Sequence, residues 1–324
     1  MSESIAELGK DFSSAILAKV GGFFKAVWQD FIKFVKTNPQ YLLASVIYYV
    51  LASFALGGAF IGFGIALLSY LISLFIAFTP IGEKLLRFFE HVRRIETKQE
   101  KAYLLPLFDE VYSQAKENNP KLGKIELCII DKMTVNACAM GKHTIAVTKG
   151  AIETFNADEL KAMIAHEIAH ILYGDTMARL YMSVGNGLFT VFVLATRAFI
   201  FIAEMIEKIA SKKKASFSFA WVIIALIKFL FTLILLVVQS LMQMVLAISN
   251  RRSEFRADRY AYELGYGEKL VAGLYMLEKM QLGANASIIQ KMTANHPRIT
   301  ARIERIEILL DQESTMQGNP WALN

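Results

Sequence analysis

A long stretch without charged side chains stands near the start of the sequence. Residues 37–82 contain only apolar and uncharged polar residues, with several glycines in the middle. One crossing of a bilayer needs about 20 apolar residues, so this stretch is long enough for two. We expect membrane spans at about 41–58 and 62–80, joined by a glycine-rich turn. Basic residues flank both outer ends, which favours a cytoplasmic position for those ends.

Two further apolar runs follow later in the chain. Residues 180–202 and 215–249 are each interrupted by a single charge, at Arg197 and Lys228. We interpret them as a second hairpin, which gives about four spans in total. The lysines at 212–214 would then lie at the outer tip, against the usual bias of basic residues toward the cytoplasm. A hairpin that enters the membrane without crossing it is therefore the open alternative.

The segment after the first hairpin has the mixed polarity of a soluble domain. Residues 83–118 are expected to be helical, with an interruption at Pro106. The apolar run 125–130 and the alternating, β-branched run 143–148 predict two strands.

A further helix is expected between Asn156 and Gly174. The Asn156 side chain can cap the first turn, and Glu159 can return a bond to the backbone of the cap. Gly174 suits the end of a helix, so the helix should run to about Tyr173.

The first 36 residues form an amphipathic arm. Apolar residues recur at helical spacing, and lysines are interleaved with them. Such a helix can lie on a membrane surface or pack on the protein itself, and both interpretations stay open. The predicted segments are the arm (1–36), the first hairpin (37–82), a first soluble part (83–179), the second hairpin (180–249) and a second soluble part (250–324).

Composition agrees with a membrane protein that has a substantial soluble part. Apolar residues make up 55% of the chain and charged residues 20%, and the formal net charge is +6. The basic residues gather beside the apolar runs and form no basic-aromatic motif, so we expect no nucleic-acid partner. Cys128 and Cys138 are too few for a disulfide framework and are expected to be core thiols.

The strongest chemical signal is the sequence His166-Glu167-Ile168-Ala169-His170. Residues four apart share one face of a helix, so both imidazoles can reach a single ion. Glu167 projects to the adjacent flank, where it can take a proton from a water. This is the H-E-x-x-H pattern of zinc hydrolases. The predicted helix also carries Asp158, Glu159 and Lys161, which argues against an intramembrane protease.

A third metal ligand is available directly after the last apolar run. Glu254 and Asp258 are also four apart on a predicted helix. Glu254 can bind the metal, while Asp258 accepts the outer N–H of a ligand histidine, for which we favour His166. Because all three ligands must lie on one side of the membrane, the chain between His170 and Glu254 must cross it an even number of times.

These motifs, in this order, resemble those of the M48 metallopeptidases. The resemblance rests on His166–His170, Gly174-Asp175, Asn136–Gly141, Glu254–Asp258 and His296-Pro297. It covers roughly residues 100–310 and the preceding hairpin, and it is strongest to the bacterial HtpX type, which are membrane-bound heat-shock proteases. The long N-terminal arm, Cys138 and Ser253 depart from the family pattern.

The resemblance implies a fold and a cofactor. The expected fold is of the α+β class: a mainly helical gluzincin-type metalloprotease domain with a small edge sheet, attached to about four transmembrane helices. One Zn²⁺ per chain would be bound by His166, His170 and Glu254. Glu167 would activate the water and pass its proton to the leaving amine.

Substrate is expected to bind beside the histidine helix. Residues 136–141 and 143–148 predict an edge hairpin, and an extended polypeptide can add to such an edge by backbone hydrogen bonds. The resemblance places substrate contacts at Asn136, Ala137, Cys138, Ala139, Thr144, Ile145 and Ala146, while an ordinary solvated edge is the alternative. His296 is a candidate to stabilise the oxyanion, and a packing role for it is equally open.

The expected function is that of a zinc endopeptidase of the bacterial cytoplasmic (inner) membrane, with its catalytic domain in the cytosol. Its partners would be polypeptide substrates, above all misfolded or unassembled membrane proteins, and the lipid bilayer. The oligomeric state is not set by the sequence. Two alternatives are a non-proteolytic membrane scaffold or chaperone with a structural metal site, and a prenyl-protein (CAAX-type) protease. A structural site needs no general base, and a prenyl-protein protease is expected to have more spans.

Overall fold

The computed structural model describes most of the chain in two compact units. The described residues are 2–37, 46–50, 52–53, 60–210, 251–283 and 298–318, with scattered positions between 223 and 240. One unit comprises residues 1–82 and 184–235, and the other residues 83–183 and 236–324. His296, most of the span predicted at 41–58 and most of the one predicted at 215–249 lie outside the described residues.

The second unit contains a four-stranded mixed sheet. Its strands are β1 (Val92–Arg94), β2 (Glu126–Ile130), β3 (Ala137–Met140) and β4 (Thr144–Thr148), in the order β1-β2-β4-β3. β2 and β4 are parallel, whereas the β1–β2 and β3–β4 pairs are antiparallel. Both strands predicted from the sequence and the edge hairpin are thus confirmed.

The prediction for residues 83–118 was partly wrong. Helix α4 (Pro80–Phe89) is followed by the strand β1, and a new helix, α5 (Lys98–Asn118), begins at a capping box between Thr97 and Glu100. Pro106 lies inside α5 without ending it. Proline removes one helical hydrogen bond, but Pro106 is exposed to solvent while the opposite face of α5 is buried. The buried face therefore keeps the helix continuous.

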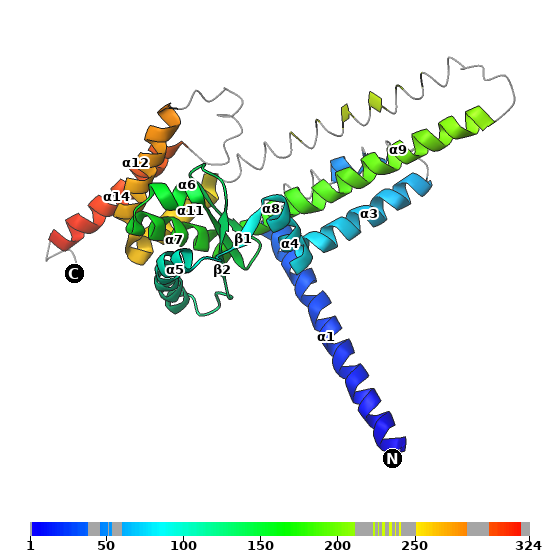
Figure 1. The fold of residues 1–324 in the computed structure, drawn as a ribbon, viewed down its shortest axis with the longest axis horizontal. Coiled ribbons are helices and arrows are strands. Elements are labelled where there is room, and N and C mark those ends of the chain that lie inside the picture. Colours follow the sequence, from blue (N-terminus) through cyan, green and yellow to red (C-terminus); the bar gives the residue numbers. More distant parts are fainter. Residues whose placement is uncertain are drawn as a thin grey trace. The chain divides into compact units, whose positions relative to one another are not determined.

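Helix α7 (Ala157–Tyr173) lies at the centre of this unit (Figure 1) and carries the H-E-x-x-H sequence. It packs against α5, α11 (Arg251–Ala261), α12 (Gly267–Gly283) and β3. Every residue from Ile164 to His170 is buried. Ala162, Ala165 and Ala169 have small side chains, so neighbouring elements approach the helix closely. The other helices of the unit are α6 (Lys149–Thr154), α8 (Thr176–Leu180), the π-helical η2 (Tyr262–Tyr266) and α14 (Ile299–Gly318).

Both ends of α7 follow the sequence prediction. The Asn156 side chain accepts hydrogen bonds from the backbone N–H groups of Asp158 and Glu159, each at 3.0 Å, and the Glu159 carboxylate accepts the Asn156 N–H. Gly174 ends the helix with φ +81°, in the left-handed region that glycine adopts without strain. The caps fix the start and the end of the helix that carries His166, Glu167 and His170.

The described residues of the first unit are helical except for the bend at Thr79. It contains α1 (Ser2–Thr37), α3 (Phe60–Phe78) and α9 (Gly187–Ala210), which is preceded by the π-helical η1 (Tyr181–Asn186). α3 and α9 lie side by side (Figure 1), with the rings of Tyr70 and Phe189 5.0 Å apart. The last turns of α1 contact the end of α3 through Phe31, Phe34 and Phe78.

The described residues include one or two candidate membrane spans. The helical stretch Thr176–Thr196 is long and apolar enough to cross a bilayer by itself. Gly62–Phe78 and Pro80–Phe89 are long and apolar enough for one crossing only when they are taken together, and the chain bends by 83° between them. Proline at position 80 cannot donate the backbone hydrogen bond that would continue α3. Among the described residues, these candidates fall in the regions of the second and third of the four expected spans.

Replacing Asn156 with alanine should destabilise the second unit. The substitution removes the acceptor for two N–H groups of α7, and the loss of such a cap costs about 1 kcal/mol. The midpoint of thermal unfolding of the detergent-purified chain should fall for Asn156→Ala and stay close to wild type for Asn156→Asp, which keeps the acceptor. Equal midpoints for Asn156→Ala and wild type would show that the cap contributes nothing.

Candidate metal centre

Two imidazoles of α7 converge one helical turn apart. His166 and His170 are 4% and 9% exposed, and their rings are nearly perpendicular. Their Nε2 atoms lie 3.2 Å apart. The prediction that residues four apart bring both imidazoles to one point is therefore confirmed.

Glu254 reaches the same point from α11. Its Oε2 lies 3.4 Å from His166 Nε2, and its Oε1 lies 3.4 Å from His170 Nε2. Neighbouring ligand atoms around a tetrahedral zinc are about 3.3 Å apart, given bonds of about 2.0–2.1 Å. The separations of 3.2 and 3.4 Å therefore suit three ligands of one ion.

Carboxylates hold the outer nitrogens of both rings. His166 Nδ1 is 2.9 Å from Asp258 Oδ1, and His170 Nδ1 is 3.1 Å from Asp175 Oδ2. If each Nδ1 donates a proton to its carboxylate, each neutral ring directs the lone pair of Nε2 inward. Two lone pairs that face each other at 3.2 Å fit a cation between them. The His166–Asp258 contact was expected, but the role of Asp175 beside His170 was missed.

Arg302 of α14 is the main residue that the sequence analysis overlooked. It is 6% exposed, and its Nε and Nη2 donate to both oxygens of Asp258 at 2.8 and 2.5 Å. Its Nη1 lies 3.4 Å from Glu254 Oε2. A signal was present in the sequence, because Arg302 adjoins Ile299, Ile303 and Ile306, which recur at helical spacing.

The charges of this cluster compensate one another. Burial opposes ionisation of Asp258, but the Arg302 guanidinium and the bond with His166 outweigh it and hold the pKa of this carboxyl below its usual range. Burial likewise lowers the pKa of His170, but Asp175 and Glu254 raise it to about 10. The surroundings of the two imidazoles therefore favour positive charge.

Glu167 faces the edge strand of the sheet. It is 6% exposed, and its Oε2 accepts the backbone N–H of Ala139 at 2.7 Å. One ligand-type atom each of His166, Glu167 and His170 lies within 4.8 Å of the others. Glu167 thus stands beside the histidines and contacts the strand that was predicted to bind substrate.

β3 is the edge strand that faces Glu167, and β1 forms the opposite edge of the sheet. Backbone groups alternate along an antiparallel pair: Asn136 C=O accepts from β4, whereas Ala139 N–H points away from it toward Glu167. Thr144, Ile145 and Ala146 lie in β4, between β2 and β3, and their expected place at the edge was wrong. Cys138 in β3 is half-buried, whereas Cys128 in β2 is fully buried.

The turn between β3 and β4 is held from two sides. Gly141 has φ +58°, and a Cβ at this position would collide with the Glu83 carboxylate. Glu83 accepts hydrogen bonds from Thr144 Oγ1 at 2.6 Å and from Lys142 N at 3.1 Å. Thr176, just after α7, donates to Gly141 C=O at 2.5 Å. These contacts fix the hairpin beside the metal-binding helix.

Comparison with known proteins identifies the family of this chain. Residues 98–309 match the profile of peptidase family M48. The chain belongs to this family. With the His166, Glu167 and His170 group in place, the protein is a metalloendopeptidase.

The similar proteins include proteases named HtpX. The chain is 28% identical to protease HtpX of Actinobacillus pleuropneumoniae serotype 5b over 225 residues, which cover 63% of this chain and 72% of the relative. It is 26% identical to protease HtpX of Tolumonas auensis over 300 residues, which cover 84% of this chain and 97% of the relative. A crystal structure of Ste24p from S. mikatae aligns with a TM-score of 0.44 and 19% identity, over 94% of this chain and 66% of that one.

Replacing Arg302 with lysine should weaken metal binding. Lysine keeps the charge but cannot donate two parallel bonds to Asp258, and loss of an outer partner of a metal ligand typically costs 10- to 100-fold in affinity. Zinc affinity of the purified full-length chain can be measured by competition with a chromophoric chelator. Arg305→Lys, on the exposed face of the same helix, is the matched control. Wild-type affinity for Arg302→Lys would contradict the role of the Arg302–Asp258 pair.

Proposed function

We propose that this protein is a zinc endopeptidase in which His166, His170 and Glu254 hold one Zn²⁺ per chain. The observation that carries the proposal is the approach of both Nε2 atoms and the Glu254 carboxylate to within 3.2–3.4 Å of one another. Two imidazoles and a carboxylate are a usual ligand set for catalytic zinc. Bound there, the ion would polarise the scissile carbonyl and lower the pKa of a water.

Glu167 is the general base of the proposed reaction. It takes a proton from the attacking water and then delivers it to the nitrogen of the leaving amine. Its hydrogen bond with Ala139 N–H fixes the carboxylate beside the two histidines. Asp258 and Asp175 orient the imidazoles from outside, and Arg302 balances the charge of Asp258.

The polypeptide substrate adds to the edge of β3 in this proposal. Ala137 and Ala139 direct their backbone groups away from β4, and Ala139 lies directly beside the proposed base. A substrate strand paired there is recognised through its backbone, which suits an enzyme that accepts many sequences. His296 stays a candidate for oxyanion stabilisation on the basis of the sequence alone.

The natural substrates are misfolded or unassembled membrane proteins, cut at the cytosolic face of the bacterial inner membrane. The apolar runs on both sides of residues 83–179 and the similarity to proteases named HtpX support this assignment. A scaffold with a structural metal site is less well supported, since such a site gives no reason to bury Glu167 next to the histidines.

Separate substitutions of the proposed base and of one proposed zinc ligand test the roles assigned to them. Glu167→Gln should bind zinc like wild type and cleave an unfolded protein about 10²- to 10⁴-fold more slowly, the usual contribution of a general base. Glu254→Gln should lose zinc affinity as well as cleavage. Both are measured on detergent-purified full-length chain, with the exposed Glu153→Gln as control. Full cleavage by Glu167→Gln would refute the base, and zinc binding without cleavage by wild type would favour the scaffold.

A peptide with one methylated backbone nitrogen tests the edge pairing. N-methylation removes a hydrogen-bond donor and leaves every side chain unchanged. In a series methylated at successive positions of a cleaved peptide, we expect an alternating loss of kcat/KM, because only every second backbone unit faces the strand. Uniform rates, or one loss confined to the scissile bond, would show that the peptide is not bound as an added strand.

A further inference from the structure

Helix α1 packs on the end of α3. The ring of Phe24 stacks on Phe75 at 5.3 Å, and Phe31 and Phe34 contact Phe78 at 5.7 and 5.5 Å. Phe75 and Phe78 are in the last turn of α3, which ends at Phe78. α1 therefore docks at one end of this apolar helix.

The direction of α1 differs from that of the helices it joins. α3 and α9 run side by side, whereas α1 extends away from the end of α3 at a steep angle to both (Figure 1). If α3 crosses the bilayer, as the proposed function requires, a helix that packs crosswise on its end lies in the plane of the membrane surface. This placement follows from contacts within the first unit alone.

The surface of α1 divides into two arcs. With 100° per residue, the apolar arc runs from Phe23 through Val27 and Phe31 to Trp28 and Ile32. Only part of this arc is covered: Val27 and Phe34 are 9% and 4% exposed, whereas Phe24 and Trp28 are 53% and 62% exposed. An exposed aromatic border of this kind is typical of helices at a membrane interface.

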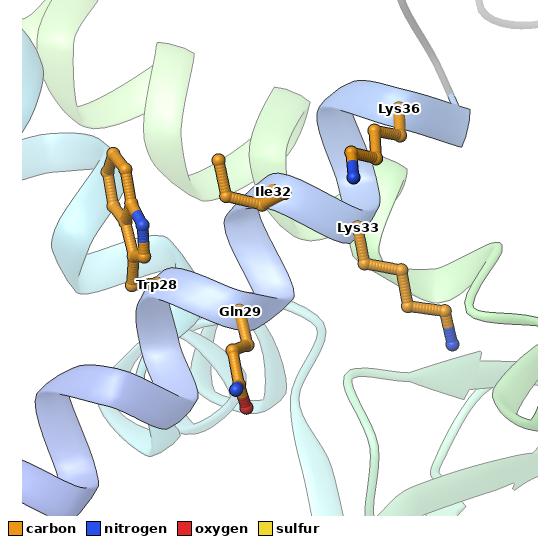
Figure 2. A pocket seen from close by; sticks show the side chains of 5 residues that line it. All are labelled: Trp28, Gln29, Ile32, Lys33 and Lys36. Carbon is orange, nitrogen blue, oxygen red and sulfur yellow. The ribbon is translucent and has the colours of Figure 1, made fainter.

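The other arc is basic. Lys25, Gln29, Lys33 and Lys36 follow one another at helical spacing beside Trp28 and Ile32, and we call these four residues the basic face. Residues 18–36 contain four lysines and one acidic residue, Asp30, a net charge of +3. Along the last turns of α1, Trp28, Gln29, Ile32, Lys33 and Lys36 line a hollow of about 650 Å³ (Figure 2).

We propose that α1 is an interfacial helix whose basic face binds the phosphate groups of anionic phospholipids. Lysines beside a bilayer are attracted to anionic headgroups, while Trp28 and Phe24 occupy the boundary with the acyl chains. Charge complementarity selects this occupant, because the lysine ammonium groups of the basic face border the indole of Trp28. The N-terminal arm, which forms α1, thus gives the protease a contact with lipid that is separate from its metal site.

The fluorescence of Trp28 tests the proposal in the intact chain. The sequence has three tryptophans, so Trp221→Phe and Trp321→Phe leave Trp28 as the single reporter. The protein is placed in phosphatidylcholine nanodiscs that contain brominated phosphatidylglycerol or brominated phosphatidylcholine, which quench nearby indoles. We expect half-quenching at a severalfold lower mole fraction of the brominated phosphatidylglycerol.

Charge variants identify the residues responsible. Lys25→Gln, Lys33→Gln and Lys36→Gln together should abolish the preference for phosphatidylglycerol while quenching by either lipid persists. The matched control is Lys98→Gln, Lys101→Gln and Lys121→Gln, which removes three exposed charges from the other unit and should keep the preference. Cleavage of an unfolded protein is followed in parallel, so that loss of the metal-site activity is scored independently of lipid binding.

Each other outcome overturns the proposal. Equal quenching by both lipids would leave α1 at the bilayer but remove its selectivity for anionic headgroups. Absence of quenching by either lipid would place Trp28 away from the bilayer, and a dimer that shields Trp28 would show that a second copy covers the face. A preference that survives in the basic-face variant would assign the selectivity to other residues.

Discussion

The second unit, which carries the candidate metal centre, depends on a buried arrangement of compensating charges. Glu254 and Asp258 are 4% and 2% exposed, and a buried carboxylate without a partner is strongly destabilising. Arg302 is the cation that makes their burial possible, because it bonds both oxygens of Asp258 and approaches Glu254. The imidazoles complete the compensation on the opposite side. A metal ion bound by His166, His170 and Glu254 would link α7 to α11, and Arg302 connects both to α14.

The arrangement also explains how distant parts of the chain form one site. His170 and Glu254 are separated by the long apolar insertion, yet α7 and α11 pack directly against each other. The contact holds because α7 presents small residues and α11 contributes Ala257 and Ala261, both fully buried. The two helices that flank the insertion therefore belong to the same core, whatever the position of the insertion itself.

The sequence predicted most of what local chemistry determines. The limits of α7 and the strands β2 and β4 follow from capping and alternation, which act over a few residues. The pairing of His166 with Asp258 was instead inferred from the chemistry of metal sites, in which a carboxylate holds the outer N–H of a ligand histidine. Arg302 and Asp175 were missed because their partners lie on other elements or beyond a helix end, where no spacing rule applies. Pro106 was misread because only the packing of α5 shows that the proline faces solvent. The place of β4 inside the sheet likewise depends on pairing with β2, which a hairpin pattern does not reveal.

The most direct test of the central claim is zinc X-ray absorption spectroscopy on the metal-loaded full-length chain. The account predicts two imidazole nitrogens and otherwise oxygen ligands at about 2.0–2.1 Å, with loss of this spectrum in Glu254→Ala. A sulfur shell at about 2.3 Å would bring in Cys138 or Cys128. That result, or an unchanged spectrum in Glu254→Ala, would contradict the proposed ligand set.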